Sequence, residues 1–305
     1  MSIDNLLWDA FRGMLTIRVV EERFLELFAA GELHGTVHTC IGQEGCAVAV
    51  IGSLDPERDT VVSNHRGHGH YLVHSRYDLD GLIGEVTGRA SGVSAGVGGT
   101  QQLHRKNFYS IGIQGGLVPA AVGMAFAEKL TGSRNVVCVC IGDGTLGQGV
   151  VYESMNIASK WSLPILFVVE ANSYAQSTPT EVQHAGSLVG RATAFGIESF
   201  EMQADDVAAM RDRASKVVSQ MRVDRRPVFL VLRTYRLGPH SKGDDHRPKE
   251  ELDAHWARDP LSSLRAKLQA IDEGRMGRTE QVVKGEVDAA FRRVLASPAR
   301  MGSGD

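Results

Sequence analysis

Two apolar segments with a turn and a helix-length segment between them restrict the fold of this chain most strongly. Residues 136–142 read Val-Val-Cys-Val-Cys-Ile-Gly, and residues 163–171 read Leu-Pro-Ile-Leu-Phe-Val-Val-Glu-Ala. Short, β-branched apolar runs on either side of a helical segment are typical of a parallel strand–helix–strand unit. The pattern therefore predicts two neighbouring parallel strands, and ligands of open α/β sheets bind at the carboxyl edge of such strands.

Side chains suited to a magnesium-bound diphosphate follow these strands. Asp143 comes directly after the first strand, and Asn172 directly after the second. Gly142 and Gly144 would let backbone amides approach an anion, and the following helix would direct the positive end of its dipole toward it. A carboxylate, an amide oxygen and a phosphate form an all-oxygen ligand set, which suits Mg²⁺. The sequence predicts a magnesium–diphosphate site at this edge.

The same region resembles a known motif. Gly142-Asp143-Gly144 precedes Asn172 by about thirty residues, which is similar to the motif of thiamine-diphosphate enzymes. One branch is most similar: the alpha subunits of the first, decarboxylating component of 2-oxo acid dehydrogenase complexes, of pyruvate, branched-chain and acetoin types. Further matching segments are Gln148-Gly149, Tyr152-Glu153, Asn156-Ile157-Ala158, Lys160-Trp161 and Leu163-Pro164. The resemblance extends from the first helix to about Pro260.

The resemblance implies the thiamine-diphosphate-binding fold, an α/β fold with a doubly wound, mostly parallel sheet. We expect a single domain over residues 1–305, with an N-terminal helix at 5–30 and a C-terminal helical extension at about 258–297. Hydrophobic periodicity independently predicts alternating helices and strands, with a buried helix at 118–130 and strands near residues 60, 136, 165, 197 and 228.

The family pattern implies specific ligands for the cofactor. Asp143, Asn172 and the carbonyl of Tyr174 correspond to its metal ligands, although Ala171 replaces the asparagine that usually precedes Asn172. Arg66 corresponds to a diphosphate ligand, and its forked donors suit a phosphate. Further contacts to the cofactor are expected from Gly142, Gly144, Thr145, Asn172 and His240, and from Gly112, Ile113 and Gln114 near its rings.

Gln114 departs from the family, in which this position is usually Val or Leu. Three interpretations stay open: a hydrogen bond from Gln114 to the substrate, a shift of the cofactor contact to Ile113, or a plain loop.

Histidines form the second group of candidate catalytic residues. The segment 64–70 reads Asn-His-Arg-Gly-His-Gly-His, which is compatible with a transition metal, although Arg66 would repel a cation. The resemblance instead implies that His65 and His68 face the active site. It also implies that His240, just before Ser241, contacts the diphosphate and assists proton transfer near neutral pH. A zinc site and a structural polar loop stay open as alternatives for segment 64–70.

The function implied by the resemblance is that of a 2-oxo acid or acetoin dehydrogenase alpha subunit, with acyl transfer to the lipoyl group of an acyltransferase. A beta subunit would supply the glutamate that activates thiamine, in an α₂β₂ heterotetramer. Two alternatives stay open: a two-chain decarboxylase that releases an aldehyde, and a non-catalytic subunit with the cofactor fold. A nicotinamide-dependent oxidoreductase is disfavoured, because no Gly-x-Gly-x-x-Gly follows an early strand.

The substrate is not decided by the sequence. The histidine-rich segment is similar to acetoin and pyruvate types, whereas Lys242-Gly243-Asp244-Asp245 is closer to branched-chain types.

Composition disfavours several other classes of protein. A formal net charge of −3 gives no electrostatic case for nucleic acid or an anionic membrane. No apolar run approaches the ~20 residues that span a bilayer. The N-terminus lacks the basic region of a signal peptide. The four cysteines, Cys40, Cys46, Cys138 and Cys140, show no Cys-x-x-Cys spacing. We therefore expect their thiols to be reduced and the protein to be cytoplasmic.

Overall fold

The computed structural model describes residues 3–33, 35–241, 243 and 245–300. In this part of the chain seven strands form one sheet, in the order β2-β3-β1-β4-β5-β9-β8. Neighbouring strands are parallel, except that β2 and β3 are antiparallel. The strands are β1 (Thr60–Ser63), β2 (His104–Arg105), β3 (Phe108–Ser110), β4 (Val137–Gly142), β5 (Ile165–Ala171), β8 (Glu198–Gln203) and β9 (Val228–Arg233). The predicted mostly parallel α/β sheet is confirmed.

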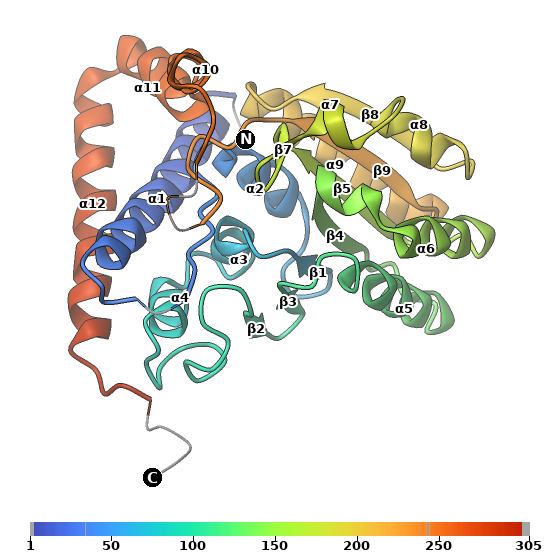
Figure 1. Ribbon diagram of the computed structural model, residues 1–305, viewed down its shortest axis with the longest axis horizontal. Coiled ribbons are helices and arrows are strands. Elements are labelled where there is room, and N and C mark those ends of the chain that lie inside the picture. The colour runs from blue at the N-terminus through green and yellow to red at the C-terminus, as the bar shows by residue number, and fades with distance from the viewer. Residues whose placement is uncertain (1–2, 34, 242, 244, 301–305) are drawn as a thin grey trace.

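Helices cover both faces of the sheet (Figure 1). Side chains of β4 alternate between the two layers: Val137 and Val139 pack with α5 (Leu117–Leu130), α6 (Gly149–Lys160) and α8 (Leu188–Thr193). Cys138 and Cys140 pack in the opposite layer, which contains α1 (Ile3–Ala29), α2 (Glu44–Val50), α3 (His68–His74), α4 (Leu79–Val86) and α9 (Val207–Asp224). Burial on both faces explains why these strands read as continuous apolar runs.

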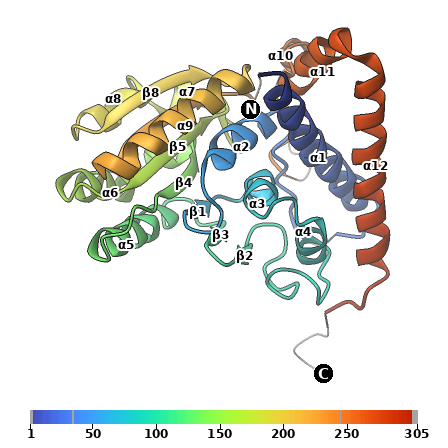
Figure 2. The same ribbon diagram turned by 180° about the vertical axis from the view of Figure 1, so that it is seen from behind.

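The terminal helices lie together on one side of the molecule. The chain ends in α10 (Lys249–Trp256), α11 (Pro260–Ile271) and α12 (Glu273–Leu295), and α12 lies beside α1, remote from α5 and α6 (Figures 1 and 2). Phe24 and Phe291 join α1 and α12 by an edge-to-face contact, with ring centroids 5.4 Å apart. These helices occupy most of the segments expected to be helical at 5–30 and 258–297, while the single-domain assignment stays a prediction.

A buried ion network connects the N-terminal helix α1 to α2 and α11. Nε of Arg18 lies 2.5 Å from Oε1 of Glu44, and Nη2 of Arg18 lies 2.9 Å from Oδ1 of Asp259. Asp259 also caps α11 by accepting from the backbone amides of Leu261 and Ser262. One guanidinium therefore ties α1 to both α2 and α11.

Helix α5 is buried on one side only, which corrects the expectation of a buried helix at 118–130. Leu117, Val118, Ala121, Val122 and Ala125 are buried against the sheet. Its opposite side is exposed, and Leu130 keeps 71% of its surface accessible. The sequence is apolar all round this helix, but the sheet covers only the side that faces it.

The four cysteines are buried and unpaired, as expected. No helix in the described residues has both the length and the apolar character that crossing a membrane requires.

Candidate functional site

The ends of β4 and β5 place the two predicted metal ligands side by side. Gly142 and Glu170 are paired in register, so Asp143 and Asn172 follow at the same edge of the sheet. Both line a cavity of about 260 Å³. Of the predicted site residues, this cavity is lined by His65, Arg66, Gln114, Gly142, Asp143, Gly144, Thr145, Asn172, Tyr174 and His240.

The carboxylate of Asp143 is buried and held by two donors. Asp143 begins the 3₁₀ helix η2 (Asp143–Gly147), and its Oδ1 accepts from the backbone amide of Gly144 at 2.9 Å. Its Oδ2 accepts from the hydroxyl of Thr180, at the start of α7 (Thr180–Gln183). Thr180 reaches it because the ribbon of β6 (Tyr174–Ala175) and β7 (Thr178–Pro179) folds back over η2. The carboxylate is therefore fixed in direction.

The amide of Asn172 is oriented by its neighbours. The backbone amide of Tyr174 donates to Oδ1 of Asn172 at 3.3 Å, and Nδ2 of Asn172 donates to Oε1 of Gln43 at 3.0 Å. A backbone N–H can only donate, so the atom beside it must be the oxygen. The Tyr174 phenol donates to Glu251 at 2.9 Å, which leaves the backbone of Tyr174 at the cavity.

The donors at this edge fit a hard divalent cation beside a phosphate. A carboxylate, an amide oxygen and a backbone carbonyl form the oxygen-only ligand set that Mg²⁺ takes. A Cβ built on Gly142 would meet no protein atom within 4 Å, so the backbone lies open on the side where Gly142 lines the cavity.

Arg66 is a buried cation in the wall of this cavity. It donates to the carbonyl of Thr39 at 2.8 Å, and to both the carbonyl and Nδ1 of His240 at 3.0 Å. It forms no ion pair with a carboxylate of the described residues. Burial, reinforced by the nearby charge of Arg236, lowers the pKa of Arg66 to about 9. A buried charge without a counter-ion is unfavourable, so the site favours a bound anion.

Three imidazoles gather at the site, and two of them, His65 and His240, line the cavity. The ring centroid of His38 lies 4.6 Å from that of His65 and 4.9 Å from that of His240. Because the guanidinium of Arg66 can only donate, Nδ1 of His240 is an acceptor and the neutral ring carries its proton on Nε2.

The same tautomer follows for His65. Nε2 of Gln114 lies 2.7 Å from Nδ1 of His65 and 3.2 Å from the carbonyl oxygen of Gly112. Since that carbonyl can only accept, the Gln114 group between them is the NH₂. It donates to His65, whose neutral ring therefore carries its proton on Nε2.

This arrangement disfavours a transition-metal site. Ligand atoms of His38, His65 and His240 can lie within 4.8 Å of one another. A metal-bound imidazole usually donates its other N–H to an acceptor, whereas here the other nitrogens of His65 and His240 face donors. The three histidines of segment 64–70 also separate: His68 contacts Glu21, and His70 lies 3.3 Å from Glu170.

His68 lies in the core and does not line the cavity. It is the first residue of α3, and both of its ring nitrogens are engaged: Nδ1 lies 2.9 Å from Oε2 of Glu21, and Nε2 lies 2.9 Å from the carbonyl of Thr100. Gly112 and Ile113 do not line the cavity either, and Ile113 is 67% exposed.

Several lining residues were not indicated by the sequence. Glu170, Gln148 and Gln176 face the cavity, and Glu170 is buried at the end of β5. A glutamate inside an otherwise apolar strand is the one signal that could have marked Glu170. No feature of the sequence marked Thr180 and His184, because they reach Asp143 only through the folding of the β6–β7 ribbon.

Comparisons with known proteins identify the family of this chain. The alpha subunit of the pyruvate dehydrogenase E1 component of Zymomonas mobilis is 36% identical over 293 residues, 93% of this chain and 82% of that protein. The corresponding subunit of Rhizobium meliloti is 35% identical, covering 97% and 85% of the two chains. The alpha subunit of the acetoin:2,6-dichlorophenolindophenol oxidoreductase of Bacillus subtilis is 33% identical, covering 98% and 91%. Residues 12–301 match the family described as the dehydrogenase E1 component. This chain belongs to the dehydrogenase E1 component family.

Proposed function

We propose that this chain is the alpha subunit of a thiamine-diphosphate-dependent 2-oxo acid or acetoin dehydrogenase. Membership of the E1 family implies thiamine diphosphate as the cofactor, and the relatives' designation as alpha subunits implies a beta subunit. One observation carries the proposal: Arg66, a buried cation that pairs with no described carboxylate, lines the same cavity as the oxygens of Asp143 and Asn172. A diphosphate bound with a divalent cation satisfies both groups.

We assign the cation to Asp143, Asn172 and the carbonyl of Tyr174, and the diphosphate to Arg66, with Gly142, Gly144, Thr145 and His240 around it. When bound, the cofactor supplies a nucleophilic carbon and an electron sink for cleavage beside a carbonyl group. Arg66 neutralises part of the phosphate charge. Gly142 leaves room beside the sheet edge, because it has no side chain to enter the cavity.

His65 and His240 would act on the substrate from their Nε2–H groups. Arg66 donates to Nδ1 of His240, and Gln114 donates to Nδ1 of His65, which fixes the Nε2–H tautomer of both rings. Burial, reinforced by the nearby charge of Arg66, lowers the pKa of His65 to about 2. His65 is therefore neutral at physiological pH and serves as a hydrogen-bond donor to a substrate oxygen. Gln114 is a positioning residue for His65. His68, which the cavity does not reach, has no direct part in this proposal.

A beta subunit is needed to complete the site. The cavity of about 260 Å³ is smaller than the ~300–1,000 Å³ of ordinary small-molecule sites, which supports a cofactor site shared with a second subunit. Ile113 is exposed near the cavity, and Phe126, Leu130, Ile157 and Trp161, in the C-terminal halves of α5 and α6 and directly after α6, are exposed apolar residues. We place the beta subunit over this side, where it supplies the activating glutamate in an α₂β₂ heterotetramer.

The acyl acceptor in this proposal is the lipoyl group of an acyltransferase. We also propose a cytoplasmic location, which the buried, unpaired thiols support because reducing compartments keep thiols free.

The test is turnover by the chain alone and by the chain co-expressed with its beta subunit. Reduction of 2,6-dichlorophenolindophenol is followed with pyruvate, branched-chain 2-oxo acids and acetoin. We expect activity only when both subunits, thiamine diphosphate and Mg²⁺ are present. Full turnover by the isolated chain would overturn the two-subunit site. Release of free aldehyde without the dye would indicate a decarboxylase, and the absence of any thermal stabilisation by the cofactor and Mg²⁺ would indicate a non-catalytic subunit.

A further inference from the structure

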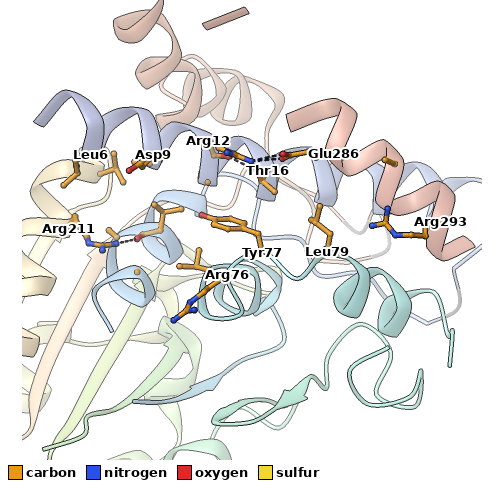
Figure 3. A pocket seen from close by; sticks show the side chains of 18 residues that line it. Leu6, Asp9, Arg12, Thr16, Arg76, Tyr77, Leu79, Arg211, Glu286 and Arg293 are labelled. Carbon is orange, nitrogen blue, oxygen red and sulfur yellow. Dashed lines mark hydrogen bonds and ion pairs between the residues drawn. The ribbon is translucent and has the colours of Figure 1, made fainter. Parts of the chain in front are cut away.

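A second cavity, of about 860 Å³, lies outside the cofactor site and shares no lining residue with it. It is enclosed by α1, α2, α9, α12 and the connection between α3 and α4 (Figure 3). Its volume falls within the range of small-molecule sites. Its walls combine apolar residues, among them Leu6, Ala10, Val48, Val73, Leu79 and Val207, with charged residues that include Asp9, Arg12, Arg211 and Glu286.

Arg211 is the notable cation of this cavity. Its Nη1 donates to the carbonyl of Val48 at 3.0 Å, but no carboxylate of the described residues forms an ion pair with it. The three other arginines of the lining are paired with carboxylates: Arg12 with Glu286 at 2.9 Å, Arg76 with Glu57 at 3.5 Å, and Arg293 with Asp80 at 2.5 Å. Arg211 therefore offers positive charge to a ligand in a way that its neighbours do not.

Tyr77 brings a hydroxyl group to the same cavity. Figure 3 shows its ring between Arg211 and Leu79, with the hydroxyl on the side of Arg211. Tyr77 and the preceding Arg76 have φ values of +64° and +56°, a left-handed conformation that is unfavourable for residues with a Cβ. Such strain is often found at functional sites.

Two glycines make room for these polar groups. A Cβ on Gly13 of α1 would clash with the hydroxyl of Tyr77, and a Cβ on Gly52 would clash with the guanidinium of Arg211. The backbone thus approaches both side chains closely, and both are held against the wall rather than extended into solvent.

We propose that this cavity binds an anionic amphiphile, a molecule with an apolar body and a carboxylate or phosphate head group bound by Arg211 and Tyr77. The apolar walls remove the body of the ligand from water, which supplies affinity. The guanidinium and the phenol donate charge-assisted hydrogen bonds to the head group. This site is separate from the cofactor site and does not depend on the proposed function.

Calorimetric titration of the full chain, co-purified with its beta subunit, tests the proposal. The probes are octanoate, octyl phosphate and octanol. We expect at least one of the two anions to bind about tenfold more tightly than octanol, because charged hydrogen bonds are roughly twice as strong as neutral ones. The tighter anion identifies the head group. Equal binding of octanol, or no binding of either anion, would overturn the proposal.

Variants locate the binding site. Arg211→Gln and Ala289→Phe, which fills the cavity from α12, should each weaken anion binding by about tenfold. Arg213→Gln is the matched control, since Arg213 lies on the same helix but is exposed and packs over Phe200. Unchanged affinity in Ala289→Phe would refute the site even if Arg211→Gln failed to fold. Displacement of the anion by thiamine diphosphate would place it in the cofactor cavity instead, which would also refute the proposal.

Discussion

Gln114 donates a hydrogen bond from its side-chain amide to Nδ1 of His65, over 2.7 Å. This contact joins the Gln114 side chain to a histidine that lines the cavity; a hydrogen bond from Gln114 to the substrate and a shift of the cofactor contact to Ile113 stay predictions. Burial, reinforced by the nearby charge of Arg66, lowers the pKa of His65 to about 2. Gln114 and His65 therefore form a neutral donor unit in the cavity wall.

Substitution of Gln114 by glutamate should raise the pKa of His65 while leaving the ring neutral at physiological pH. A carboxylate beside Nδ1 favours the charged ring, and an opposite charge at this range raises a histidine pKa by about 1 to 3. Nitrogen-15 NMR of the imidazoles identifies the tautomer near neutral pH. On acidification to about pH 4, the wild-type ring should stay neutral, whereas the ring in Gln114→Glu should begin to protonate. Gln114→Leu is the control, because it removes the hydrogen bond and adds no charge. A wild-type His65 protonated on Nδ1 would contradict the account.

Arg66→Gln should weaken binding of thiamine diphosphate far more than binding of thiamine, which lacks phosphates. Hydrogen bonds to charged groups contribute about 1.5–3 kcal/mol, so a loss of roughly ten- to a hundredfold is expected for the diphosphate alone. Fluorescence titration of the two-subunit enzyme measures both ligands. The control is Arg265→Gln, on an exposed ion pair with Glu280 of α12. Equal losses for thiamine and its diphosphate would show that Arg66 does not contact the phosphates.

The main strands could be predicted from the sequence, but the short ones could not. β4 and β5 are long β-branched runs buried on both faces, a pattern that few other structures produce. β2, β3, β6 and β7 have two or three residues each, too few for a period to appear. The exposure of one side of α5 could not be predicted either, because the sequence does not show whether the chain itself covers its apolar residues.

Site residues divide in the same way. The placement of Asp143 and Asn172 at one edge of the sheet was predictable, because the end of a parallel strand fixes where the next side chain lies. His68 was not, because its place depends on Glu21, which is 47 residues away in the sequence and belongs to α1. The start of α3 directs His68 toward α1, whereas His65, in the preceding turn, reaches the cavity.

Arg18→Met should destabilise the fold by about 3–5 kcal/mol, because it leaves Glu44 and Asp259 buried without their cation. Urea denaturation measures this loss. Arg12→Met is a matched control on the same helix: the Arg12–Glu286 pair is exposed, and such pairs contribute about 0–1 kcal/mol. Similar losses of unfolding free energy in the two variants would show that the buried network stabilises the fold no more than an exposed ion pair does.

The Glu21–His68 pair should make stability depend on pH at both ends. Burial alone would raise the pKa of Glu21, but His68 lowers it below its ordinary 4.5. Burial alone would lower the pKa of His68, but Glu21 raises it above 6.5. The contribution of the pair is therefore full between these ordinary values. It is lost as pH falls through the lowered pKa of Glu21, and as pH rises through the raised pKa of His68.

Denaturation of the wild type and of a Glu21→Gln variant across pH measures this effect. The difference in stability between the two proteins should be largest between about pH 4.5 and 6.5 and should shrink on either side. A difference that is constant over the whole pH range would show that the pair is not ionised in the folded state.

The position of the divalent cation tests the central claim most directly. The measurement is an anomalous difference map of the two-subunit enzyme crystallised with thiamine diphosphate and Mn²⁺ in place of Mg²⁺, for the wild type and for Asp143→Asn. We predict one peak within ~2.0–2.3 Å of oxygens of Asp143, Asn172 and Tyr174 in the wild type, and its loss or strong weakening in the variant. A peak that lies elsewhere, or that persists unchanged in Asp143→Asn, would contradict the account.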